Sequence, residues 1–125
     1  MAKILVFCET QKGHLKRSSQ ELLQAAKKSG AETHALFLEA SAVSALAEAA
    51  HHGAQAVHLF KDDSLDQYNS ELFCGALALV TEKIKPQIIL ASASSTGKDL
   101  FPRLAARLQT GIASDCIELQ IQGYC

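Results

Sequence analysis

Short apolar runs rich in β-branched residues alternate along this chain with longer segments whose apolar residues recur every three or four positions. The short runs predict strands, and they lie at residues 3–7, 33–38, 56–60 and 88–91. The longer segments predict helices over residues 18–29, 41–52 and 70–85, with a fourth that carries Leu100, Leu104 and Leu108 on one face. Strands that alternate with helices form parallel sheets covered on both faces, because right-handed crossovers place a helix after each strand. The sequence therefore predicts a single doubly wound α/β domain over residues 1–125.

Several residues mark where the helices should begin and end. Ser18 with Glu21 has the spacing of a capping box, and Gly30 and Gly53 stand where helices commonly close in the left-handed conformation. Asn69 or Ser70 should cap the third helix, and Pro86 should stop it. Pro102 is compatible with the fourth helix only near its first turn. Ile112 and residues 116–121 predict short terminal strands.

Charge and composition exclude several classes of function. The formal net charge is −1 and aromatic residues make up 6% of the chain, so neither a basic phosphate-binding face nor a base-stacking surface is expected. The four cysteines include no C-x-x-C pair and no zinc-ligand spacing with histidine, which favours reduced thiols and no metal site. No apolar run has the length of a membrane span, and no leader pattern precedes the first strand. We expect a cytoplasmic protein, or one in its mature form, without nucleic acid or membrane insertion.

The loop over residues 92–99 is the most informative stretch for binding. Ligands of doubly wound sheets sit beyond the carboxyl ends of strands, where the strand order reverses. Here small hydroxyl residues run into a helix N-terminus, so Ser94, Thr96, Gly97 and Lys98 are candidate ligands for an anion. The loop is no P-loop, because that motif needs glycine in place of Ser92. The plainer alternative is that Thr96 or Asp99 caps the helix and Gly97 allows a tight turn.

Other chemically capable residues have simpler explanations. Cys8 and His14 in the loop after the first strand invite a nucleophile hypothesis, but Cys8 at a strand end is typical of a small buried apolar residue. The histidines at 34, 51, 52 and 58 show no metal-site spacing, so structural or surface roles are expected. Arg103 lies four residues after Asp99 and should reach back to it along the helix.

A long run, residues 91–106, resembles the alpha subunit of electron transfer flavoproteins. That family has a similar small-residue loop followed by Gly97-Lys98-Asp99-Leu100 and then Pro102-Arg103 with two alanines. Residues 111–116 also resemble the turn that follows in the family, and the similarity extends over nearly the whole chain. The resemblance implies a Rossmann-like fold similar to that of the adenine nucleotide alpha hydrolases.

The resemblance also implies a function. The family's alpha subunit pairs with a beta subunit and carries FAD mainly on a C-terminal domain. The complex takes electrons from flavin dehydrogenases, as in fatty acid beta-oxidation, and passes them to a membrane quinone oxidoreductase. The N-terminal domain, which this chain resembles, is a scaffold and subunit interface. The resemblance thus implies an electron-carrier subunit rather than an enzyme, in a heterodimer of the bacterial cytoplasm or the mitochondrial matrix.

This sequence differs from the family in ways that keep two alternatives open. The FAD-binding domain is absent from these 125 residues, so no flavin is expected on this chain itself. After the first strand the family tends to have Ala-Glu-His, whereas this chain has Cys8-Glu9-Thr10, so only Glu9 matches. One alternative is a stand-alone adenine-nucleotide-binding module of the stress-protein or hydrolase-like type. The other is a hydrolase that uses Cys8 or His14.

Overall fold

The fold is built on a six-stranded, mainly parallel sheet with the strand order β5-β4-β1-β6-β8-β7. The computed structural model describes residues 3–38, 43–60, 68–108, 112–113 and 117–120. The strands of this sheet are β1 Lys3–Phe7, β4 Glu32–Phe37, β5 Ala56–Leu59, β6 Ile88–Ala91, β7 Ile112–Ala113 and β8 Ile117–Gln120. Strands β5, β4, β1 and β6 are parallel, whereas β8 runs antiparallel to β6 and to β7. The predicted α/β class is confirmed. Cys116 and Ile121, which bound the predicted last strand, lie outside the described residues.

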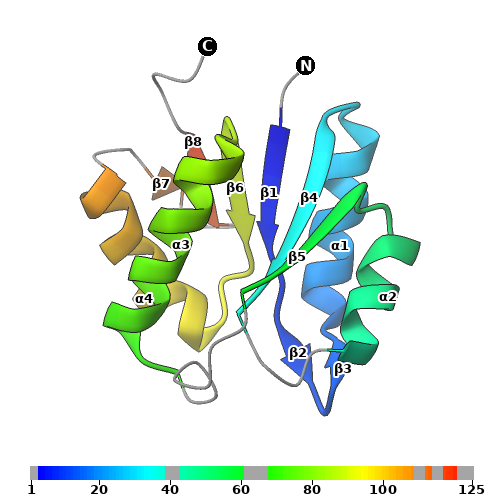
Figure 1. Ribbon diagram of the computed structural model, residues 1–125, viewed down its shortest axis with the longest axis horizontal. Helices are drawn as coiled ribbons and strands as arrows, with labels where there is room; N and C mark the ends of the chain where they lie inside the picture. Colours follow the sequence, from blue (N-terminus) through cyan, green and yellow to red (C-terminus); the bar gives the residue numbers. More distant parts are fainter. Residues whose placement is uncertain (1–2, 39–42, 61–67, 109–111, 114–116, 121–125) are drawn as a thin grey trace.

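Helices cover both faces of the sheet, as Figure 1 shows. The helices are α1 Arg17–Lys28, α2 Val43–His51, α3 Ser70–Ile84 and α4 Ser95–Leu108. Helices α1 and α2 lie on one face, and α3 and α4 lie on the other. The predicted start of the second helix, Ser41, lies outside the described residues. No helix in the described part of the chain combines the length and the hydropathy that a membrane crossing requires.

The central strand β1 explains why both faces are covered. Leu5 and Phe7 pack in a core with α3 and α4, whereas Ile4 and Val6 pack in the opposite core with α1 and α2. Side chains of a strand alternate between faces, so a continuous apolar run supplies both cores at once. Burial on both faces is the usual environment of a parallel strand.

The predicted capping box at the first helix is wrong. Helix α1 begins at Arg17, and its N-cap Lys16 makes no side-chain cap hydrogen bond. Glu21 instead lies on the exposed surface, 3.6 Å from Arg17. The neighbouring Ser19 is fully buried, and its hydroxyl accepts a hydrogen bond from the Glu9 backbone N–H at 3.0 Å. The helix start is therefore set by a contact with the loop after β1, which local spacing does not reveal.

Helix α4 begins earlier than its apolar pattern indicates. Ser94 caps it, because its hydroxyl accepts from the Gly97 N–H at 3.1 Å and its carbonyl accepts from the Lys98 N–H at 2.8 Å. Neither Thr96 nor Asp99 is the cap. Pro102 consequently lies inside the helix rather than in its first turn, with its ring exposed to solvent. At the third helix the prediction is confirmed for Asn69, whose side chain accepts from the N–H groups of Glu71 and Leu72.

Sequence reasoning missed a short hairpin between β1 and α1. Strands β2 (Thr10–Gln11) and β3 (His14–Leu15) pair antiparallel across the two residues Lys12 and Gly13. Both turn residues have positive φ, 53° and 82°. Two-residue hairpin turns with positive φ at both positions match the twist of the strands, and glycine is favoured there. The Lys-Gly pair between short polar strands was the available signal.

Gly53 is expected to tolerate substitution less well than Gly30. Its φ is +117°, and an added Cβ would lie 2.7 Å from the Lys27 Cδ. Gly53→Ala should lower the free energy of unfolding by about 1–3 kcal/mol, because backbone strain and side-chain displacement add. Urea denaturation measures this. Gly30→Ala is the matched control, since Gly30 has φ +81° but open space around the added carbon. Equal losses at the two positions would contradict the packing contribution.

Candidate functional site

The candidate site lies at the carboxyl edge of the sheet, where the strand order reverses. Strand β1 has β4 on one side and β6 on the other, so the chain turns away in opposite directions from this point. The loops after β1 and β6 therefore meet. They bring Glu9 into contact with Ser92 and Ser94, which follow it in the sequence by 83 and 85 positions.

The Glu9 carboxylate occupies this point. Its Oε2 accepts a hydrogen bond from the Ser92 hydroxyl at 2.6 Å. The Ser94 hydroxyl donates to the same carboxylate and lies 2.9 Å from both oxygens. Glu9 is only 9% exposed. A buried carboxylate is stable only when its oxygens are hydrogen-bonded, and here the two serine hydroxyls provide those bonds.

The backbone of Glu9 is also held. Its N–H donates to the Ser19 hydroxyl at 3.0 Å, and its carbonyl accepts from the Lys16 N–H at 2.9 Å. The Ser94 residue that binds the carboxylate is the N-cap of α4, whose N-terminus carries the positive end of the helix dipole. One acidic residue thus joins β1, α1 and the start of α4.

Of the four residues predicted to bind an anion, Ser94 contacts this carboxylate. Ser94 donates its hydroxyl proton to Glu9 and accepts from Gly97, so the hydroxyl and the Gly97 N–H both have internal partners. Gly97 is buried, Thr96 is partly buried, and Lys98 is exposed to solvent. An anion contacting Ser94 would lie close to the negative charge of Glu9, which disfavours it electrostatically. Anion binding by these four residues stays a prediction.

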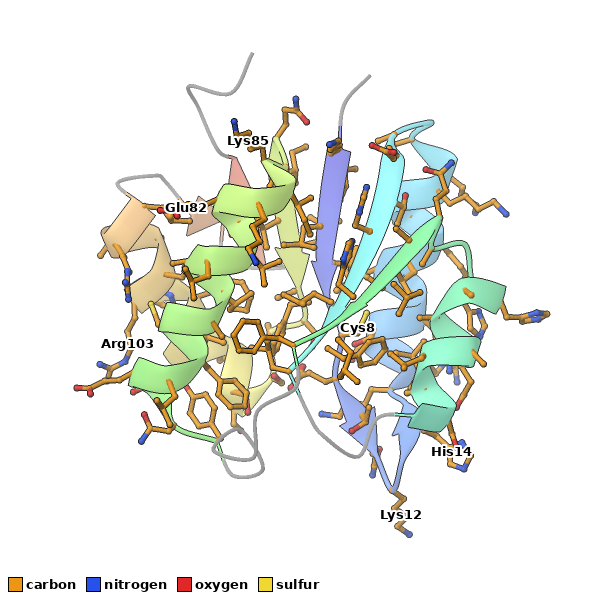
Figure 2. All side chains as sticks on the ribbon, viewed as in Figure 1. Cys8, Lys12, His14, Glu82, Lys85 and Arg103 are labelled. Atoms are coloured by element: carbon orange, nitrogen blue, oxygen red, sulfur yellow. The ribbon has the colours of Figure 1, made fainter. Side chains whose placement is uncertain are left out.

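The structure does not bring Cys8 and His14 together as a nucleophile and its base. Cys8 is buried, and burial raises the pKa of its thiol to about 12, which disfavours the reactive thiolate. His14 lies on the β2–β3 hairpin, where its Nδ1 is 3.0 Å from Glu48 Oε1. Figure 2 shows Cys8 inside the fold and His14 on the outside, beside one end of α2. This geometry does not support the hydrolase alternative.

Comparison with known proteins places the chain in a family. The family model described as "Electron transfer flavoprotein domain" matches residues 4–124. The chain belongs to the electron transfer flavoprotein family. "Protein FixB" of Clostridium saccharobutylicum is 33% identical over 123 residues, which is 95% of this chain and 36% of the relative. "Electron transfer flavoprotein subunit alpha" of Syntrophomonas wolfei is 30% identical over 121 residues, 97% of this chain and 38% of the relative. "Acryloyl-CoA reductase electron transfer subunit beta" of Anaerotignum propionicum is 33% identical over 122 residues, which is 94% of this chain and 33% of the relative.

The chain spans about a third of the length of these relatives. The run that carries the family resemblance, residues 91–106, covers the end of β6, the loop over residues 92–94 and most of α4. Its serines hold Glu9, the residue that also fits the family pattern after the first strand. The segment that resembles the family therefore includes the two serines that bind Glu9 where the strand order reverses.

Asp99 in this run links α4 to the start of α3. The Tyr68 hydroxyl donates to Asp99 Oδ2 at 2.6 Å, and Arg103 Nε lies 3.5 Å from Oδ1, so the predicted Asp99–Arg103 contact is confirmed. The hydrogen bond from Tyr68, with Arg103 nearby, lowers the pKa of Asp99. Burial and the bond to Asp99 raise the pKa of Tyr68 to about 12.

Replacing Tyr68 should move the titration of Asp99. A carboxyl with a lowered pKa stabilises the fold above its ordinary pKa, and this contribution disappears as the pH falls through the lowered value. Tyr68→Phe removes the donor, so the Asp99 pKa should rise toward its ordinary value. NMR detection of the carboxyl carbon between pH 2 and 6 measures the shift, with Leu79→Ala on the exposed side of α3 as control. An unchanged Asp99 titration would contradict the hydrogen bond.

Proposed function

We propose that this chain is the N-terminal scaffold and subunit-interface domain of an electron transfer flavoprotein alpha subunit. In this proposal it is part of an FAD-containing carrier that passes electrons from dehydrogenases to the respiratory chain. Family membership supports the electron-transfer role. The observation that carries the scaffold role is the position of the Glu9 carboxylate. It accepts hydrogen bonds from the hydroxyls of Ser92 and Ser94 at the place where doubly wound sheets bind ligands. The FAD is expected on the C-terminal part of the longer protein, and the domain itself is expected to be neither flavin-binding nor catalytic.

The exposed side of α3 supports the interface part of the proposal. Leu72 and Leu79 are 45% and 52% exposed, and their spacing of two helical turns places them on the same side of the helix. Larger exposed apolar surfaces mark interaction sites, so two large apolar side chains exposed on one side of a helix make that side a candidate. The partner we propose for this surface is the electron transfer flavoprotein beta subunit.

Mixing the chain with an electron transfer flavoprotein beta subunit tests the interface. Sedimentation velocity should detect a complex with the original chain. Leu79→Glu should weaken it at least tenfold, because a charge at the centre of an apolar contact is costly to desolvate. Ala25→Glu on the opposite face is the matched control, since Ala25 is exposed on α1. Loss of binding in both variants, or in neither, would count against the α3 surface.

The wider setting follows from the same proposal. Flavin dehydrogenases would be the electron donors and a membrane quinone oxidoreductase the acceptor, as in fatty acid beta-oxidation. The complex would be a heterodimer in the bacterial cytoplasm or the mitochondrial matrix. If the flavin is held elsewhere in the longer protein, the 125-residue chain purifies without the visible absorbance of a flavin. Stoichiometric flavin on this chain would contradict the assignment.

A second candidate is a stand-alone adenine-nucleotide-binding module. The switch point and the N-terminus of α4 favour it, because both are features of nucleotide sites in doubly wound sheets. The two functions make opposite predictions for ATP. A module of this kind should bind ATP with saturation in equilibrium dialysis, whereas a scaffold whose switch point contains its own carboxylate should retain none at millimolar nucleotide.

A further inference from the structure

The outer side of α3 lacks the polar residues that a surface helix normally carries there. Residues 72–81 include no charged side chain. The described part of the chain exposes three large apolar or aromatic side chains, and all of them lie on α3 or just before it: Tyr68, Leu72 and Leu79. A helix that is apolar on every side is normally buried on every side. The outer side of α3 therefore has the composition of a surface that another molecule covers.

An arginine of the neighbouring helix lies over this side of α3. Helices α3 and α4 lie side by side on one face of the sheet (Figure 1). Gly75 comes three residues after Leu72 and four before Leu79, so it stands between them on the same side of α3. The Arg107 Nη1 of α4 is 3.9 Å from the place that a Cβ of residue 75 would occupy. The glycine thus leaves room for a guanidinium group between the two leucines.

Arg107 has no carboxylate partner among the described residues. It is exposed to solvent, and none of the ion pairs in the described part of the chain includes it. Arg103, one turn earlier on α4, lies 3.5 Å from Asp99 instead. A guanidinium in water needs no partner, but a charge that is covered without one is costly. A molecule that covers the two leucines must therefore also supply an acceptor for Arg107.

We propose that Arg107 determines the specificity of the α3 surface by binding a carboxylate of the electron transfer flavoprotein beta subunit. Apolar side chains on either side of that carboxylate contact Leu72 and Leu79. The inference rests on the proposed function and adds to it the chemistry of the partner's contact. An aspartate or glutamate fits the planar fork of a guanidinium with two parallel hydrogen bonds. Arginine is also less strongly hydrated than lysine, which suits it to ion pairs inside an interface.

The affinities of Arg107 variants for a beta subunit from the same organism, measured by calorimetry, test this contact. Arg107→Ala should weaken the complex about tenfold or more, because truncated arginines at the centre of an interface are often costly. Arg107→Glu should weaken it further, since a like charge would then face the partner's carboxylate. Arg107→Lys, which keeps the charge without the fork, should fall between Arg107→Ala and the original chain. Arg17→Ala is the matched control and should bind like the original chain, because Arg17 is an exposed arginine on the opposite face.

The outcomes distinguish this contact from the proposed function. A complex that Leu79→Glu disrupts but Arg107→Ala leaves unchanged would keep the α3 interface and overturn the role of Arg107. Equal affinities of Arg107→Ala and Arg107→Glu would overturn the carboxylate. No complex with the original chain would contradict the proposed function itself and, with it, this contact.

Sedimentation velocity of the chain alone and thermal unfolding complete the test. The chain alone should be a monomer, and a dimer that Leu79→Glu dissociates would assign the surface to a second copy and overturn the proposal. Each arginine variant should keep the thermal midpoint of the original chain, because both arginines are exposed. A lowered midpoint for Arg107→Ala, with unchanged binding after correction for the unfolded fraction, would make Arg107 a structural residue and overturn its binding role.

Discussion

Phe101→Ala should lower the free energy of unfolding by about 3–5 kcal/mol, the largest loss expected from any single substitution considered in this chain. Phe101 on α4 is completely buried, and its ring meets Phe7 of β1 edge to face with 5.5 Å between ring centroids. Truncation removes the aromatic pair and leaves a cavity in the core shared by β1, α3 and α4. Surrounding side chains in a packed core relax only partly, so the cavity persists.

Urea denaturation followed by far-UV circular dichroism measures this loss. Leu79→Ala is the matched control, because it removes a large apolar side chain from the exposed side of α3 and should change stability by no more than about 0.5 kcal/mol. A loss below about 1 kcal/mol for Phe101→Ala would contradict the docking of α4 on the sheet.

Glu9→Ala should have the second largest effect, a loss of about 2–3 kcal/mol. The carboxylate accepts from Ser92 and Ser94, and hydrogen bonds to a charged group contribute more than neutral ones. Without it, both hydroxyls lose their acceptor in a largely buried place. Glu9→Gln keeps one acceptor oxygen but places an amide against a hydroxyl donor, so its loss should be smaller than that of Glu9→Ala.

Urea denaturation at pH 7 measures the Glu9 variants, and Glu21→Ala serves as an exposed acidic control. A double-mutant cycle with Ser94→Ala isolates the contact itself, because coupled residues lose less together than the sum of the single losses. Additive losses would contradict the contact between the two loops. They would also weaken the case that the network holds the carboxyl edge of the sheet.

Much of the fold followed from patterns within single segments. Strand β1 at 3–7 and β6 at 88–91 were predicted with their observed bounds, because a short β-branched run between breakers has few alternatives. The glycines at 30 and 53 were placed correctly after their helices for the same local reason. The start of α1 was predicted wrongly, because the helix begins at Arg17 and Ser18 therefore lies inside its first turn.

The site was harder to predict because it depends on contacts between distant segments. The hydroxyl-rich loop was recognised, but nothing in the sequence showed that Glu9 would accept its hydrogen bonds across 83 and 85 residues. His34 Nδ1 and His58 Nε2 lie 2.9 Å apart on neighbouring strands, and this contact depends on the register of two parallel strands, which alternation of apolar residues does not fix. Local patterns predicted the elements, whereas tertiary pairing decides which polar side chains meet.

The central claim is that the switch point contains a carboxylate of this chain in place of a bound nucleotide. An NMR titration of the chain with AMP tests it most directly, through the backbone amide signals of Ser94, Gly97 and Lys98. We predict no saturable shift of these signals up to millimolar AMP, because the Glu9 carboxylate engages the Ser94 hydroxyl and repels phosphate. Saturable shifts confined to residues 92–99 would contradict the scaffold assignment and favour the nucleotide-binding module.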